Sequence, residues 1–123
     1  MTIYKELKGQ VAVVTGAGRH KGLGEAMARR LALEGVKVVI TDIGTAVGEL
    51  MPESAIGTLN EMNEIVEEIR QAGGEASSFV CNVLNPEEVE AAAKFAVDTY
   101  GSLDIWVNNA GIGFVMKHSR EVT

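Results

Sequence analysis

A short apolar run that ends in a cluster of glycines is the feature that most constrains the fold of this chain. The run, Gln10–Thr15 (QVAVVT), is apolar at consecutive positions and rich in β-branched side chains, as in a strand buried on both faces of a parallel sheet. Glycines follow at positions 16, 18, 22 and 24, and helical periodicity continues to Gly35. This order predicts a strand, a phosphate-binding turn and a helix, with Leu23, Met27 and Leu31 on the buried helix face.

The rest of the chain repeats this alternation. Further strands are predicted at 36–42, 75–83 and 103–111, and further helices at 58–72 and 85–101. Thr58 and Glu61 fit a capping box, and Asn85 caps the next helix with Pro86 at its first position. The inward-facing side chains of these two helices are expected to be Leu59, Met62, Val66 and Ile69, then Val89, Ala92, Ala96 and Tyr100. The pattern predicts a Rossmann-type doubly wound α/β domain, with about four parallel strands in the order 3-2-1-4.

Composition narrows the class of protein further. The chain has 123 residues, which suits one domain, and its net charge of -6 argues against binding to a nucleic-acid backbone. It contains no apolar run long enough to cross a membrane and begins without a secretion signal. The single cysteine, Cys81, cannot form an internal disulfide, so a cytoplasmic location is expected. The acidic residues of the second helix are interpreted as a solvated face rather than a metal site: Glu61, Glu64, Glu67 and Glu68.

The glycine spacing departs from the common phosphate-binding motifs. In G-x-G-x-x-G the third glycine position falls on Lys21 or Met27, and no Gly-Lys-Ser/Thr follows for a P-loop. Two registers remain, in which either Gly18 or Gly16 is the first glycine before Gly22 and Gly24. We favour Gly16, because the strand fixes where the turn begins. Residues 19–21 (RHK) are then a cationic bulge, although glycine turns also occur without ligands.

Polar residues follow the other predicted strands. The second strand ends in Asp42, the third in Cys81-Asn82-Val83 and the fourth in Asn108-Asn109-Ala110-Gly111. An acidic residue after the second strand can accept hydrogen bonds from an adenosine ribose. Together with TG…GLG, these motifs resemble the N-terminal, cofactor-binding half of the short-chain dehydrogenase/reductase family, from about Gly9 to Gly111. None of these motifs is specific to that family by itself, but their combination is.

The resemblance implies a role for each matching position. The pyrophosphate loop is formed by Gly16, Gly22 and Gly24, with Leu23 packed beside them and Arg19 close to the phosphates. Asp42 binds the adenosine ribose, and Asn82 and Val83 meet the adenine. Asn109, Ala110 and Gly111 lie along the cofactor and brace the central strand. The carboxylate of Asp42 favours NAD, whereas the cationic bulge favours NADP; we predict NAD.

Some positions depart from the family pattern. Five residues separate Gly16 from Gly22, where family loops usually have three. Position 82 is more often Asp in the family, but Asn82 keeps an acceptor oxygen. The segment 43–57 is long for a connection, and is either a lid near the adenosine end or a surface loop.

The resemblance implies an oxidoreductase that transfers a hydride between the nicotinamide and a small alcohol or ketone. The family's catalytic serine, tyrosine and lysine lie beyond N-N-A-G, so we predict no catalytic residue in this chain. Tyr4 and Lys8 have the tyrosine–lysine spacing, but they precede the first strand, at the end of the sheet opposite the cofactor. We therefore expect a fragment of a longer enzyme that is inactive alone. The alternatives are a non-enzymatic nucleotide-binding or assembly module, and an enzyme that is completed by another chain, for example by strand exchange across the open edge of the fourth strand. A homo-oligomer is expected.

Overall fold

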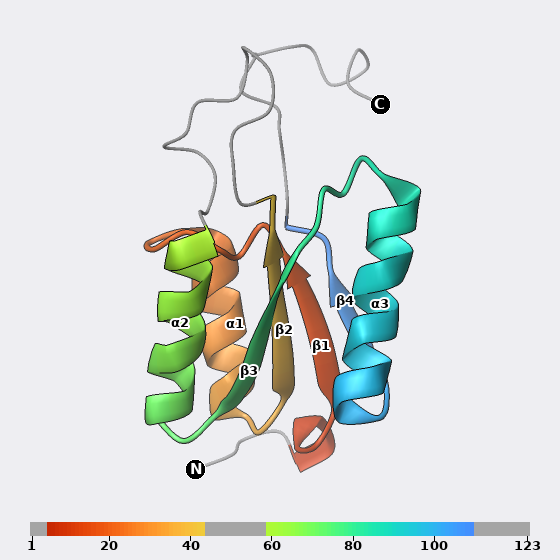
Figure 1. Cartoon of the computed structure of the whole chain (residues 1–123). Coiled ribbons are helices and arrows are strands. Elements are labelled where there is room, and N and C mark those ends of the chain that lie inside the picture. The colour runs from red at the N-terminus through yellow and green to blue at the C-terminus, as the bar shows by residue number, and fades with distance from the viewer. Residues whose placement is uncertain (1–4, 44–58, 110–123) are drawn as a thin grey trace, which may run out of the picture.

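The computed structural model describes residues 5–43 and 59–109. A 3-10 helix, η1 (Lys5–Leu7), precedes an alternation of strands and helices. In chain order these are β1 (Val11–Thr15), α1 (Leu23–Leu33), β2 (Lys37–Asp42), α2 (Leu59–Gln71), β3 (Glu75–Val80), α3 (Pro86–Tyr100) and β4 (Ile105–Val107). The four strands are parallel and lie in the order β3-β2-β1-β4, which confirms the predicted Rossmann-type topology (Figure 1).

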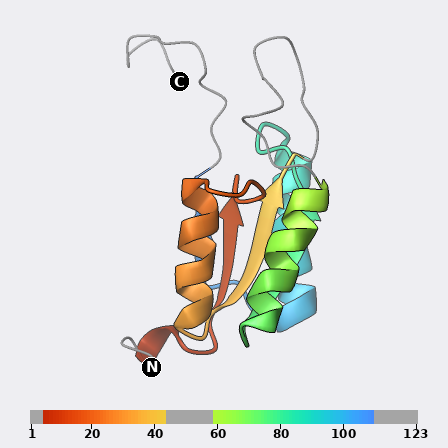
Figure 2. The same ribbon diagram turned by 90° about the vertical axis from the view of Figure 1, so that its left-hand side faces the viewer.

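The sheet is the middle of three layers, with α1 and α2 on one face and α3 on the other (Figures 1 and 2). Residues of β1 and β2 alternate between two cores. Ala12, Val14 and Ile40 pack with the α1 and α2 side chains, whereas Val13 and Val39 pack with Ala96 of α3. All five β1 residues are buried, as expected for a central strand covered on both faces. The carboxyl ends of the parallel strands β1 and β2 lie side by side at one edge of the sheet.

The buried face of α1 differs from the predicted one. Leu23, expected inside, is 69% exposed, and the buried residues are Gly24, Glu25 and Ala28. Met27 and Leu31 are half-buried, and Leu31 packs against the core, so Leu23 is the one residue of the predicted face that is exposed. Small residues decide this orientation: a Cβ at Gly24 would lie 2.8 Å from Ala17 Cα, so the helix approaches the turn closely only where a side chain is missing. Apolar spacing alone did not reveal this close approach.

The other two helices follow their sequence signals more closely. Met62, Ile65, Val66 and Ile69 of α2 are buried, but Leu59, predicted inside, is 48% exposed in the first turn. Thr58 lies outside the described residues, so its predicted cap is not described. Asn85 caps α3 by accepting a hydrogen bond from the Glu87 N–H, and Pro86 is the first helical residue. Ala92 and Ala96 are buried, while Val89 and Tyr100 are half-buried.

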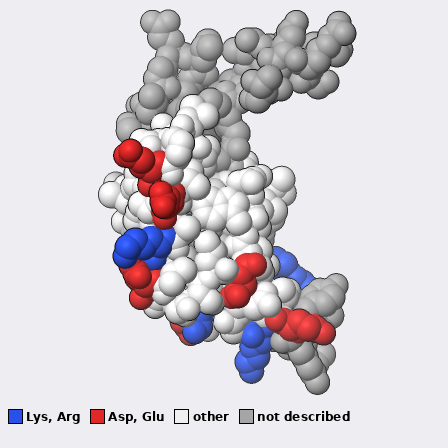
Figure 3. Space-filling model, turned by 90° about the vertical axis from the view of Figure 1, so that its right-hand side faces the viewer, with Lys and Arg blue, Asp and Glu red and all other residues white. Residues whose placement is uncertain are grey.

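The charged residues on the exposed side of α3 are spaced along the helix: Glu87, Glu90, Lys94 and Asp98. Figure 3 shows blue and red side chains standing apart or beside one another on a mainly uncharged surface. One such pair joins Lys94 Nζ to Asp98 Oδ2 over 2.7 Å. Among the described residues, no helix is long and apolar enough to cross a membrane.

Candidate functional site

The glycine turn begins at the carboxyl end of β1. Gly16 has a φ of +67°, which a residue with a side chain seldom adopts, so it is the residue at which the chain turns. The next N–H, that of Ala17, donates to the Thr41 carbonyl and holds the turn against β2. Gly24, in the first turn of α1, lies against this turn, because a Cβ there would be 2.8 Å from the Gly16 carbonyl oxygen. Strand, turn and helix entry are therefore one closely packed unit.

Asp42, the last residue of β2, is attached to this turn. Its side chain is buried, with the residue 9% exposed, and its Oδ2 accepts the Gly18 N–H over 3.2 Å. Its Oδ1 accepts the N–H of Ile43. Gly18, the first glycine of the register that was not favoured, has no room for a side chain: a Cβ there would lie 2.8 Å from Asp42 Cβ and 2.3 Å from Met62 Cγ.

Asn109 braces the same turn from the far side. Its side-chain Nδ2 donates to the Gly16 carbonyl over 3.2 Å, and its N–H donates to Thr15 Oγ1 over 3.1 Å. The Thr15 hydroxyl in turn donates to the Val107 carbonyl. The end of β4 is thereby tied to the end of β1. Ala110 and Gly111, the next predicted site residues, lie outside the described residues.

Asn82 and Val83 follow β3 at the same edge of the sheet. The N–H of Cys81 donates to the Asp42 carbonyl, which sets the end of β3 beside Asp42. Asn82 Oδ1, the predicted adenine acceptor, accepts the Leu84 N–H in a local turn, and an amide oxygen can accept two hydrogen bonds. Val83 is half-buried. Cys81 is a buried free cysteine, and burial raises the pKa of its thiol.

The N-terminus of α1 has the features of an anion-binding site. Gly22 is the N-cap, with an extended backbone, and no side-chain cap is found there among the described residues. Arg19 is exposed, and its guanidinium lies over Gly22. A Cβ added to Gly22 would be 3.7 Å from Arg19 Nε. A helix N-terminus and a guanidinium both attract phosphate oxygens. These groups meet the electrostatic requirement of a pyrophosphate site.

The two residues that lengthen the loop fold back onto α1 and α2. His20 Nδ1 lies 3.2 Å from Glu25 Oε2, and His20 Nε2 lies 3.1 Å from Glu64 Oε2. The His20 N–H donates to Glu61 Oε2. Lys21 has a φ of +64°, and its N–H donates to Glu25 Oε1 over 2.7 Å. Glu25 was not among the predicted site residues, because a charged residue was not expected on the buried side of α1.

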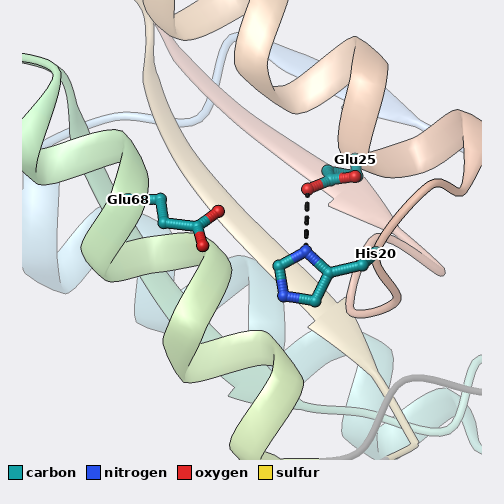
Figure 4. A group of neighbouring side chains, drawn as sticks. All are labelled: His20, Glu25 and Glu68. Carbon is teal, nitrogen blue, oxygen red and sulfur yellow. Dashed lines mark hydrogen bonds and ion pairs between the residues drawn. The ribbon is translucent and has the colours of Figure 1, made fainter.

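The acidic face of α2 is only partly a solvated face. Glu67 fits that interpretation, but Glu61 and Glu64 contact His20, and Glu68 pairs with Arg29 of α1. His20, Glu25 and Glu68 each offer a ligand atom, all within 4.8 Å of one another (Figure 4). Arg29 forms ion pairs with both Glu25 and Glu68, so its guanidinium offsets their negative charge. We therefore interpret the group as an ion-pair network.

Two groups of this network have shifted pKa values. The hydrogen bond with Glu64 is the main cause that raises the pKa of His20 above its ordinary 6.5, with the charge of Glu25 adding to it. Burial acts to raise the pKa of Glu25, but the hydrogen bonds from Arg29 and Lys21, with the nearby positive charges, outweigh it and lower that pKa. Both shifts favour the charged forms.

The parallel sheet, its strand order and the glycine turn give this chain the architecture of Rossmann-type dinucleotide-binding domains. The family model for short chain dehydrogenases matches residues 10–123, and the chain belongs to the short-chain dehydrogenase/reductase family. The enzymes of this family use NAD or NADP. The resemblance drawn from the sequence motifs is confirmed.

Individual relatives agree with this assignment. The chain is 40% identical over 119 residues to 3beta-hydroxysteroid dehydrogenase 1 of Eggerthella lenta, covering 97% of this chain and 40% of the relative. It is 39% identical over 103 residues to cyclohexanol dehydrogenase of Acinetobacter, covering 84% and 35%. The crystal structure of a hydroxysteroid dehydrogenase from Escherichia coli matches with a TM-score of 0.69 at 36% identity, covering 85% of this chain and 38% of that one. The chain thus spans 35 to 40% of the length of these relatives.

Proposed function

We propose that this chain is the cofactor-binding part of an NAD-dependent oxidoreductase that transfers a hydride between the nicotinamide and an alcohol or ketone. The observation that carries the proposal is the buried carboxylate of Asp42, held at the end of β2 by the Gly18 N–H. In this position it accepts hydrogen bonds from the adenosine ribose and repels a 2′-phosphate. It therefore selects NAD over NADP, although Arg19 lies near the site.

The described residues fit a dinucleotide. Gly18 and Gly24 leave no space for a side chain, so the glycine turn packs closely against Asp42 and the first turn of α1. The N-terminus of α1 and Arg19 receive the pyrophosphate. Asn109 keeps the Gly16 carbonyl in place, and Asn82 and Val83 border the adenine. When bound, NAD supplies or accepts the hydride, and the described residues of this chain bind and orient it.

The names of the relatives support a substrate class. Cyclohexanol dehydrogenase and the hydroxysteroid dehydrogenases are named for secondary alcohols on a ring. We propose the same class for the intact protein, as a cytoplasmic homo-oligomer. Lys8 contacts Gly35, which precedes β2, so it lies at the amino ends of the strands, away from the glycine turn; Tyr4 lies outside the described residues. The proton-transfer residues are proposed to lie outside this chain, which is then inactive alone.

An activity measurement tests this function. The intact protein is mixed with NAD and with cyclohexanol or a hydroxysteroid, and the absorbance of NADH is followed. We expect NADH to form with the intact protein and not with the 123-residue chain alone. Turnover by the chain alone would refute the proposed position of the catalytic residues. NAD binding by the intact protein without turnover of any alcohol or ketone would favour a non-enzymatic nucleotide-binding module.

A further inference from the structure

We infer that the His20–Lys21 insertion, here called the clasp, holds the glycine loop in the conformation that binds the dinucleotide. His20 is the positioning residue of the clasp, so the cofactor binds more tightly when His20 is protonated. The inference deepens the proposed function, because it concerns regulation of the same site. It rests on the contacts of three side chains: His20 in the loop, Glu25 in α1 and Glu64 in α2.

The clasp begins at the left-handed turn of the loop. Residues with a side chain seldom adopt the φ of +64° found at Lys21, so this conformation needs a stabilising contact. Glu25 supplies it by accepting the Lys21 N–H over 2.7 Å. The same turn sets the N-cap, because the Gly22 N–H donates to the Arg19 carbonyl. The proposed phosphate-binding groups, the Arg19 side chain and the first N–H groups of α1, therefore flank the segment that Glu25 holds.

His20 connects this segment to both helices. Each of its ring nitrogens faces a carboxylate oxygen, that of Glu25 in α1 and that of Glu64 in α2. A neutral imidazole has one N–H and can donate to only one of them, whereas the imidazolium donates to both. Loss of the proton therefore releases one side of the clasp. At 33% side-chain exposure the ring remains accessible to solvent protons.

The charges around His20 favour the protonated form. From α1 it faces Glu25 and, behind it, Arg29; from α2 it faces the carboxylates of Glu61, Glu64 and Glu68. Its chain neighbours are the cations Arg19 and Lys21. The hydrogen bond with Glu64 is the largest influence, and the pKa of His20 is raised. The clasp is complete below the ordinary histidine pKa and opens as the pH rises through the raised value.

The test compares three variants of the intact protein: His20→Gln, Glu64→Gln and Glu67→Gln. Glu67→Gln is the matched control, since Glu67 is exposed on the same helix and takes part in none of the contacts described here. NAD affinity is measured by calorimetry at about pH 5.5 and about pH 8.5, on either side of the histidine range. The imidazole titration of His20 is followed by NMR without cofactor.

We expect the unmodified protein and Glu67→Gln to bind NAD about fivefold more tightly at the lower pH, which is at the modest end of coupling between linked sites. His20→Gln should lose this dependence. Glu64→Gln should weaken binding at low pH and move the His20 titration to lower pH.

Two results would overturn the clasp while leaving the proposed function intact. One is NAD binding that does not change with pH, or that changes equally in His20→Gln. The other is tighter binding by Glu64→Gln, because removing a nearby negative charge would strengthen a direct attraction between His20 and the phosphates. If neither NAD nor NADP binds at either pH, the proposed function itself fails, and the clasp fails with it.

Discussion

The Gly18 N–H donates to Asp42 Oδ2 over 3.2 Å, and this bond joins the glycine turn after β1 to the end of β2. The two residues are so close that a Cβ on Gly18 would lie 2.8 Å from Asp42 Cβ. The proposed pyrophosphate-binding and ribose-binding groups therefore keep a fixed relative position. Changes at either residue should affect both folding and NAD binding.

Substituting Gly18 tests how closely the loop is packed. Gly18→Ala should lower the free energy of unfolding by about 1–3 kcal/mol, because the added methyl group meets Met62 and Asp42. Gly22→Ala is the matched control, since its nearest neighbour is 3.2 Å away and its φ is -85°. Urea unfolding at neutral pH measures both. Equal stability losses would show that the packing at Gly18 is not specific.

Two threonines in register on β1 and β2 should respond in opposite ways to the same substitution. Thr15 Oγ1 donates to the Val107 carbonyl and accepts the Asn109 N–H, so Thr15→Val leaves two partly buried groups without this partner. We expect a loss of about 1–3 kcal/mol. Thr41 Oγ1 is buried and has no hydrogen-bond partner among the described residues, so Thr41→Val should be neutral or stabilising. Thermal unfolding measures the pair, and a larger loss at Thr41 would contradict the bonding described.

The Glu25 carboxylate should make the protein sensitive to acid. Because the pKa of Glu25 is lowered in the folded protein, its carboxylate stabilises the fold at pH values above the ordinary glutamate pKa of 4.5. This stabilisation is lost as the pH falls through the lower pKa of the folded protein. Glu25→Gln should destabilise the protein by about 1–3 kcal/mol at neutral pH and flatten its acid dependence. Urea unfolding between neutral and acid pH measures this.

An exposed ion pair with the same spacing provides the control for Glu25. Lys94 and Asp98, like Glu25 and Arg29, are four residues apart on one helix, but both are exposed. Asp98→Asn should leave stability and its acid dependence unchanged. If Glu25→Gln and Asp98→Asn behave alike, the buried position of Glu25 has no energetic consequence.

The sequence predicted the architecture well, because the strongest signals are local. Apolar β-branched runs predicted the strands, and Asn85 with Pro86 predicted the start of α3. Gly16 was correctly placed at the turn, since a buried strand must end before the chain can reverse. The alternation of strands and helices predicted a parallel sheet, and the strand order followed from the doubly wound dinucleotide-binding fold that this pattern fits.

The errors arose where tertiary contacts override the local pattern. Leu23 has the spacing of a core residue, but Gly24 and Ala28 permit a closer approach to the sheet and turn it outward. The contacts of His20 with Glu25 and Glu64 join residues from three separate segments. No spacing rule connects them, although a histidine in the inserted part of the loop and a second helix rich in glutamate were available signals.

The most direct test of the central claim is a calorimetric titration of the intact protein with NAD and with NADP. The buried Asp42 carboxylate predicts that NAD binds at least about tenfold more tightly, because a 2′-phosphate would face a like charge. Asp42→Ser, which removes the charge, should reduce this preference. Tighter binding of NADP, or no binding of either dinucleotide, would contradict the account.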